Sequence, residues 1–183
     1  MGIRKYLDDY SKEYIIKPDG KPGLTAVYRG KYFRFVADTG ALNRAKLLFG
    51  VLSLLALTCT LIPLFLESEG SHTLYVALLH VASLFPLAHL LLGVFGFIYY
   101  KTPLIREFRD KTEGRICSSS IATLIMLGAT LLAETVNCTL LGYPALDLLY
   151  VVLLVLALTA TATIFLFRGV LKTEQCNKNG DSL

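Results

Sequence analysis

Four long apolar stretches, and the positions of the charges between them, limit what this chain can fold into. All 18 Lys and Arg residues of the 183-residue chain lie before residue 47, within Lys101–Arg115, or from Arg168 onward. The links Glu67–His72 and Glu134–Asp147 contain acids but no Lys or Arg. In helical membrane proteins, the short loops rich in Lys and Arg stay in the cytoplasm. The pattern therefore predicts four membrane spans with both termini in the cytoplasm.

The apolar stretches also have the length that a membrane span needs. A helix of about 20 apolar residues crosses the hydrocarbon of a bilayer, and it satisfies its own backbone hydrogen bonds, which lipid cannot do. We therefore expect an all-α integral membrane protein, a four-span helical bundle in the plasma (inner) membrane. Its predicted parts are a cytoplasmic arm at residues 1–46, spans at about 47–66, 74–100, 116–135 and 148–167, and a cytoplasmic tail at 168–183.

The N-terminal arm has a pattern of its own. Apolar residues recur there at the spacing of one helix face, at Ile3, Leu7, Tyr10 and Tyr14. Further along, Leu24–Tyr28 and Lys31–Val36 flank a turn at Arg29-Gly30, which predicts a β-hairpin. Because a lone hairpin is marginally stable in water, its aromatic side chains need the arm's own helix, the membrane surface or a partner protein to pack against.

The basic loop Lys101–Arg115 carries a short apolar face at helical spacing, formed by Leu104, Ile105 and Phe108. A short amphipathic helix at the membrane interface explains this pattern, and a docking element for a cytoplasmic partner is the alternative. The residues that we expect to contact a partner come from the arm and this loop: Tyr28, Tyr32, Phe33, Phe35, Ile105 and Phe108.

Three ionisable residues are the polar candidates within the membrane, namely His80, His89 and Glu134. Burying an ionisable group in lipid costs free energy, so each of these residues is a candidate functional residue. His80 and His89 are nine residues apart and fall on opposite faces of a straight helix, although Pro86 between them could reorient one. We expect neutral histidines that hydrogen-bond a neighbouring span or a carbonyl freed by Pro86, and proton or substrate handling is the alternative.

The predicted outer side holds several possible ligands for a hard cation: Glu67, Glu69, His72, Glu134, Asn137, Cys138 and Asp147. We expect Asp147 instead to cap the start of the fourth helix, and Glu67 and Glu69 to be solvated loop residues. No two cysteines have metal-site or redox spacing, and a Cys59–Cys138 disulfide is conceivable but not expected. The sequence therefore predicts no metal site and no cofactor.

Small residues and prolines predict how the spans pack. Pro63 removes a backbone donor and is expected to bend the last turn of the first span. Small residues let helices approach closely in lipid, so we expect those of the third and fourth spans to line the interior. They include Gly128, Ala129, Ala133 and Thr159–Thr163.

The sequence contains no motif that indicates catalysis. There is no phosphate-binding loop, no His-Glu-x-x-His pair and no Gly-x-Ser-x-Gly elbow. The net charge of +4 comes from residues that flank the spans, where anionic lipid attracts them, so no nucleic-acid partner is expected. An intramembrane enzyme using His80, His89 or Glu134 has no spacing that supports it.

The predicted function is a non-enzymatic accessory or scaffolding subunit in the lipid bilayer. Its arm and middle loop would bind a membrane or cytoplasmic protein, or a second copy of the chain. The alternative is a small oligomeric transporter or channel, with a pathway near Pro86, His80 and His89 in the second span, because such pathways use broken helices and polar groups at the membrane midplane.

Overall fold

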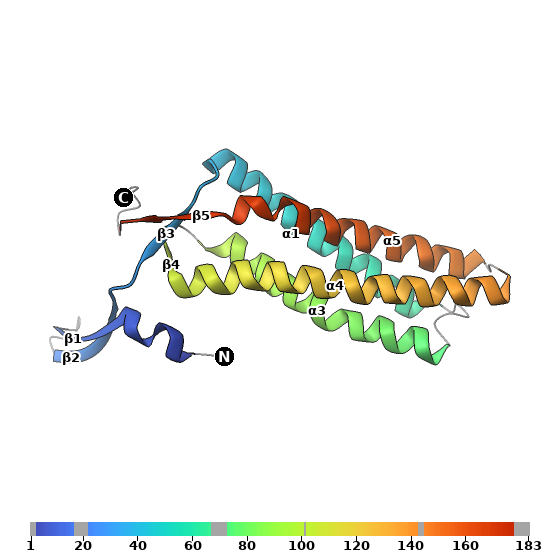
Figure 1. Cartoon of the computed structure of the whole chain (residues 1–183), viewed down its shortest axis with the longest axis horizontal. Helices are drawn as coiled ribbons and strands as arrows, with labels where there is room; N and C mark the ends of the chain where they lie inside the picture. Colours follow the sequence, from blue (N-terminus) through green and yellow to red (C-terminus); the bar gives the residue numbers. More distant parts are fainter. Residues whose placement is uncertain (1–2, 17–21, 67–72, 101, 143–144, 178–183) are drawn as a thin grey trace.

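Four long helices dominate the molecule, which a computed structural model describes over residues 3–16, 22–66, 73–100, 102–142 and 145–177. They run side by side in an elongated bundle (Figure 1). The helices are α1 (Thr39–Leu61), α3 (Leu74–Tyr99), α4 (Arg106–Leu141) and α5 (Ala145–Leu166). Each is long and apolar enough to cross a membrane, with a mean hydropathy between 1.9 and 2.5 in its most apolar part.

The four helices form a closed square. Helices α1 and α4 each pack against both α3 and α5, so every helix has two neighbours. The side chains that point outward are largely apolar; Phe85 of α3 is 73% exposed and Leu132 of α4 is 71% exposed. A bundle in water turns its polar face outward. An apolar outer surface is instead what contact with lipid requires.

Helix α4 is longer than the sequence predicted. It begins at Arg106 and has 36 residues, which corresponds to a length of about 54 Å and exceeds the roughly 30 Å of hydrocarbon in a bilayer. The prediction of a separate short helix within Lys101–Arg115 is wrong, because the chain continues from Arg106 into the span without a break. Gly114 does not end the helix, since one glycine inside a helix costs only about 1 kcal/mol.

The helix changes type at the end of α1, next to Pro63. The α-helix stops at Leu61 and continues as a 3₁₀ helix, η2 (Ile62–Phe65). Proline has no N–H to donate to the carbonyl four residues earlier, so the last turn tightens. Some carbonyls at this end of α1 therefore lack a partner within the helix, as is general for helix C-termini.

Five strands in the described part of the chain form two small sheets at the end of the bundle where α4 begins (Figure 1). The strands are β1 (Tyr10–Ile16), β2 (Pro22–Tyr28), β3 (Tyr32–Phe35), β4 (Leu104–Ile105) and β5 (Thr173–Cys176). Strand β1 pairs antiparallel with β2, and β3 lies between β4 and β5, antiparallel to both. We call this end of the bundle the basic end, and the end with Glu134 and Asp147 the acidic end.

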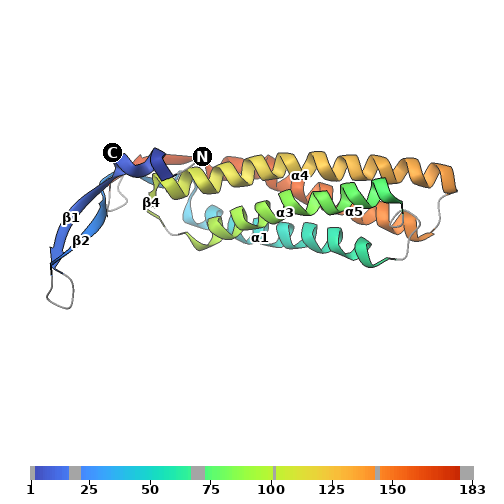
Figure 2. The ribbon, with the colours of Figure 1, turned by 90° about the horizontal axis from the view of Figure 1, so that it is seen from below.

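The arm differs from its prediction in both parts. The predicted helix is a short 3₁₀ helix, η1 (Ile3–Asp9), and Tyr10 and Tyr14 belong to β1. The hairpin consists of β1 and β2 and points away from the helices (Figure 2). The predicted pairing of Leu24–Tyr28 with Lys31–Val36 is wrong, because β3 pairs with the middle loop and the tail instead. Strand pairing depends on the neighbours that the fold supplies, and the local sequence pattern does not specify them.

The three-stranded sheet joins three distant parts of the chain. Strand β3 comes from the arm, β4 from the loop before α4, and β5 from the tail, which the 3₁₀ helix η3 (Phe167–Leu171) connects to α5. The Val36 amide extends this pairing with a 3.0 Å hydrogen bond to the Lys172 carbonyl. The sheet therefore holds arm, loop and tail together at the basic end.

Gly93 of α3 lies in tight contact with α4. A Cβ atom on Gly93 would lie 3.0 Å from the Ile116 Cγ1 atom and 3.2 Å from the Ile116 backbone nitrogen. We expect Gly93→Val to lower the free energy of unfolding by about 1–3 kcal/mol, as overpacking of a tight contact does. Thermal unfolding in mild detergent measures this loss.

Gly128 provides the matched control for Gly93. The sequence suggested that Gly128 lines a tight helix contact, but a Cβ atom there would meet nothing within 4 Å. Gly128→Val is therefore expected to leave the unfolding temperature nearly unchanged. Equal losses for the two variants would contradict the assignment of the close contact to Gly93.

Candidate functional site

The six predicted contact residues gather at the basic end, where their side chains contact other parts of the same chain. Phe35 is 9% exposed, and its ring centroid lies 5.4 Å from that of Phe97 in α3. The Arg109 guanidinium of α4 lies 4.6 Å from the centroid of the Phe33 ring. Strand β3 therefore packs its aromatic side chains against the ends of the helices.

Tyr28 connects the hairpin to the first turn of α4. Its hydroxyl group donates a 2.8 Å hydrogen bond to the Lys31 carbonyl and accepts a 3.1 Å hydrogen bond from the Arg106 amide. The first amides of a helix have no partner within it, so Tyr28 satisfies one of them from a distant segment. The Tyr28 ring also meets Tyr10 and Tyr32 edge-on, each at 5.2 Å. Burial raises the pKa of the Tyr28 hydroxyl above its ordinary value.

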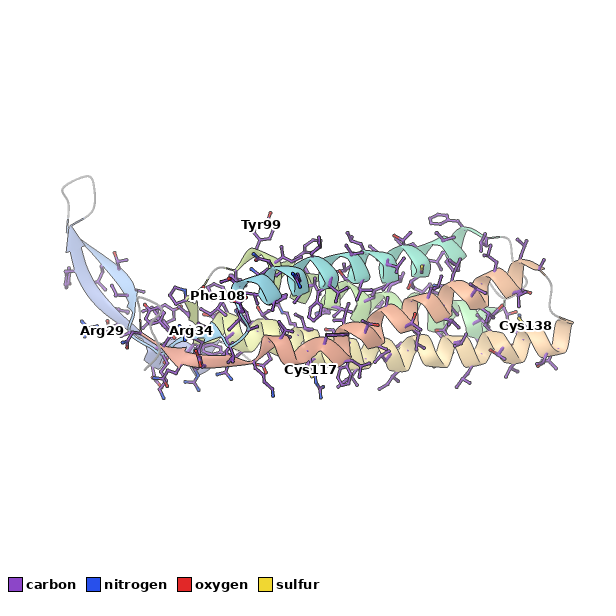
Figure 3. The ribbon with its side chains drawn as sticks, turned by 90° about the horizontal axis from the view of Figure 1, so that it is seen from above. Arg29, Arg34, Tyr99, Phe108, Cys117 and Cys138 are labelled. Carbon is purple, nitrogen blue, oxygen red and sulfur yellow. The ribbon has the colours of Figure 1, made fainter. Side chains whose placement is uncertain are left out.

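Ile105 and Phe108 complete this set. Ile105 lies in β4 opposite Tyr32, and Phe108 lies in the first turn of α4 with its ring centroid 4.4 Å from that of Tyr100. Both side chains are half-buried. Figure 3 shows Phe108 at the basic end with the sheet residue Arg34, which pairs with Glu174 of β5 at 2.6 Å.

The hairpin carries two exposed apolar side chains that face each other across its strands. Tyr14 is 79% exposed and Leu24 is 52% exposed, and the two residues lie directly opposite each other in β1 and β2. Within the described ranges, neither outer edge of this two-stranded sheet pairs with another strand. Sequence reasoning missed the pair because it placed Tyr14 in a helix, although alternation through Tyr10, Tyr14 and Ile16 is also the period of a strand.

His80 lies inside the bundle and connects three helices. It is fully buried, and its Nε2 atom lies 2.7 Å from the Thr60 carbonyl oxygen at the end of α1. Since a carbonyl only accepts, Nε2 carries the proton, and in the neutral ring Nδ1 accepts a hydrogen bond from the Tyr150 hydroxyl of α5. The expected bond from a histidine to a neighbouring span is confirmed at this position.

His89 has a different environment. It is exposed on the outer surface of α3, on the face opposite to His80, as the nine-residue spacing predicted. Pro86 lies between them inside a helix that continues from Leu74 to Tyr99. The structure therefore does not bring the two histidines together.

A second buried polar group lies at the acidic end. Glu134 and Asp147 are fully buried and Cys138 is 1% exposed. One ligand atom of each lies within 4.8 Å of the others, and the Cys138 thiol points to Glu134 Oε1 at 3.8 Å. Asp147 lies within the first turn of α5, which begins at Ala145, so it stands at the helix start where the sequence expected it to cap. Figure 3 shows Cys138 far from the basic end.

The neighbouring residue Asn137 connects α4 to the start of α3. Its Oδ1 atom accepts hydrogen bonds from Thr73 Oγ1 at 3.4 Å and from the Tyr75 hydroxyl at 3.5 Å. None of the four cysteines forms a disulfide, so the conceivable Cys59–Cys138 bridge is absent. The other residues considered for a cation site, Glu67, Glu69 and His72, lie outside the described residues.

The geometry thus presents an exposed hairpin at one end and buried polar groups further along the bundle. Comparison with known proteins finds no matching family model, no similar curated protein and no similar solved structure. The functional argument therefore depends on the residues of this chain alone.

Proposed function

We propose that this protein is a non-enzymatic accessory subunit of the plasma membrane that docks a protein partner through its β1–β2 hairpin. The bundle would span the membrane four times, with both termini and the hairpin in the cytoplasm. Three segments that hold all Lys and Arg residues meet at the basic end, which supports this orientation.

The hairpin carries the proposal. It projects beyond the helices (Figure 2), and it presents Tyr14 and Leu24 side by side in a sheet to which no third strand is added among the described residues. The edge of such a sheet is a template for an added strand. Partners that bind in this way supply an extended segment, whose backbone pairs with the edge and whose alternate side chains contact the face. The expected occupant is therefore an extended segment of a cytoplasmic or membrane protein.

The aromatic cluster beneath the hairpin fits a scaffold. Tyr28 joins the hairpin to α4, while Phe33 and Phe35 hold the adjoining strand on the helices. A hairpin alone is marginally stable, so these contacts supply a firm base for it. A displacement of the hairpin would therefore be transmitted to the helices through these packed side chains.

The transporter alternative receives less support from the second span. Both ring nitrogens of His80 already have partners within the protein, and His89 faces outward. A substrate pathway between these histidines would require α3 to rearrange at Pro86.

The test is native mass spectrometry of the tagged protein, gently extracted from its own membranes. We expect a defined hetero-complex for the unchanged chain and at least a tenfold loss of it for the double variant Tyr14→Ser/Leu24→Ser, because the apolar contact is removed. A crosslinking amino acid placed at position 24 should form a covalent link to one defined site on the same partner.

Val36→Ser supplies the matched control. Val36 is 60% exposed at the basic end but lies outside the hairpin, so its variant should retain the complex. Both variants should keep the unfolding temperature of the bundle. A complex that survives the double variant, or a pure homo-oligomer, would overturn the proposal, and the homo-oligomer would favour the transporter.

A further inference from the structure

We propose that Glu134, Cys138 and Asp147 bind a divalent transition-metal ion of the zinc class at the acidic end of the bundle. The proposal is independent of the docking function. It adds a ligand role for Asp147, because that carboxylate lies in the first turn of α5 and is buried beside the other two groups.

The geometry is that of converging ligands. Glu134 and Cys138 are four residues apart on α4 and share one face, and Asp147 approaches from the first turn of α5. Their donor atoms lie within 4.8 Å of one another. In a tetrahedral zinc site the ligand atoms are about 3.5 Å apart, so small side-chain rotations are enough to close the site.

One atom of the cluster lacks the partner that its burial demands. Glu134 is fully buried and its Oε2 atom has no hydrogen-bond donor in the portion of the chain that the structure describes. Burying a carboxylate oxygen without a partner is costly. No Lys or Arg occurs at residues 47–100 or 116–167, so these two stretches supply no ammonium or guanidinium group to neutralise it. A bound cation would provide the missing partner.

The donor set indicates the class of ion. Two carboxylates alone would suit Mg²⁺ or Ca²⁺, but a thiolate favours zinc and similar softer ions. On binding, the Cys138 thiol loses its proton to solvent and the sulfur forms a bond to the metal, which makes the affinity fall at low pH. Three protein ligands leave a fourth position for water or another ligand.

Zinc itself is the first probe. The whole chain, carrying a tag without histidines, is purified in detergent, incubated with Zn²⁺ and desalted. We expect about one ion per chain by elemental analysis, as a single site requires. Cys138→Ser and Glu134→Gln should each lower the retained zinc at least tenfold, because each removes one ligand while keeping the side-chain volume.

Cys59→Ser is the matched control. Cys59 is a buried thiol of α1 in the apolar cluster with Tyr150 and Leu154, outside the proposed ligand set, so its variant should retain the ion. Site-resolved alkylation gives a second readout, since Zn²⁺ should slow modification of Cys138 at least tenfold and leave Cys59 unaffected. Zinc retention that is equal in wild type and Cys138→Ser, or no protection of Cys138, would overturn the proposal even if one variant folds poorly.

Discussion

Phe97→Ala is expected to destabilise the protein by about 3–5 kcal/mol, the usual loss for a buried phenylalanine cut to alanine. Phe97 is fully buried in α3, between Phe49 of α1 and Phe35 of the arm, with ring centroids at 5.7 Å and 5.4 Å. The Lys46 ammonium lies 5.8 Å from the Phe97 ring centroid and also donates to the carbonyl oxygens of Ile98 and Tyr100 at the end of α3. One ring thus connects two helices and the sheet.

Two measurements check this expectation. Denaturant titration in mild detergent gives the free energy of unfolding, and limited trypsin digestion reports whether the arm has come loose at Arg29 or Arg34. Trypsin should cut the arm faster in the Phe97→Ala variant than in the unchanged protein, because Phe35 of the arm loses its packing partner. The arm would then detach before the bundle unfolds.

Phe95→Ala is the control on the same helix. Phe95 is 47% exposed on the outer face of α3, so its removal opens no internal cavity. Its unfolding free energy should change by less than about 1 kcal/mol, as is usual for surface substitutions. Equal effects of the two variants would mean that Phe97 does not join the helices to the sheet.

His80→Phe is expected to cost about 1–3 kcal/mol for each polar group that it leaves buried and unpaired. Phenylalanine fills a similar volume but cannot donate to the Thr60 carbonyl or accept from the Tyr150 hydroxyl. The Thr60 carbonyl has few alternative hydrogen-bond donors, because α1 ends at Leu61 and continues as a 3₁₀ helix that contains Pro63. Thermal unfolding in detergent measures the loss.

His89→Phe separates this structural role from a transport role. His89 is exposed on the outer face of α3, where an apolar ring fits lipid, so the unfolding temperature should stay the same or rise slightly. A transport pathway through both histidines predicts the reverse pattern, in which both variants lose flux in liposomes and both remain stable. Intact stability of His80→Phe would therefore count against the hydrogen-bonded role.

The spans could be predicted from the sequence because their signal is local. Helices α3 and α5 begin and end close to their predicted bounds, and the opposite faces of His80 and His89 followed from helical geometry. Helix α1 begins at Thr39, before its predicted start at residue 47. The start of α4 was predicted too late. In the sequence, charged residues such as Arg106 and Lys111 mark the end of a membrane span. They do not end the helix, because an exposed helix turn accommodates charged side chains. Here Lys111 and Glu107, four residues apart, form an ion pair at 2.5 Å.

The arm could not be predicted in the same way. Tyr32 and Phe33 were correctly expected in a strand, but their partners Ile105 and Gln175 are far away in sequence. The candidate site had the same limit. Glu134 and Cys138 share a face by their spacing alone, whereas the position of Asp147 beside them depends on how α5 packs on α4.

The sequence by itself determined the number of apolar helices and the separation of the basic segments from the acidic links. Both depend on the composition of continuous stretches of sequence. The hydrophobicity and charge of a stretch decide whether it enters the membrane, independently of the other segments. Only the tertiary structure decided that arm, loop and tail share one sheet, and that Glu134, Cys138 and Asp147 converge. Those contacts join segments that are far apart in the sequence. Helix packing sets the distance between these segments in space, and no local periodicity in the sequence predicts that distance.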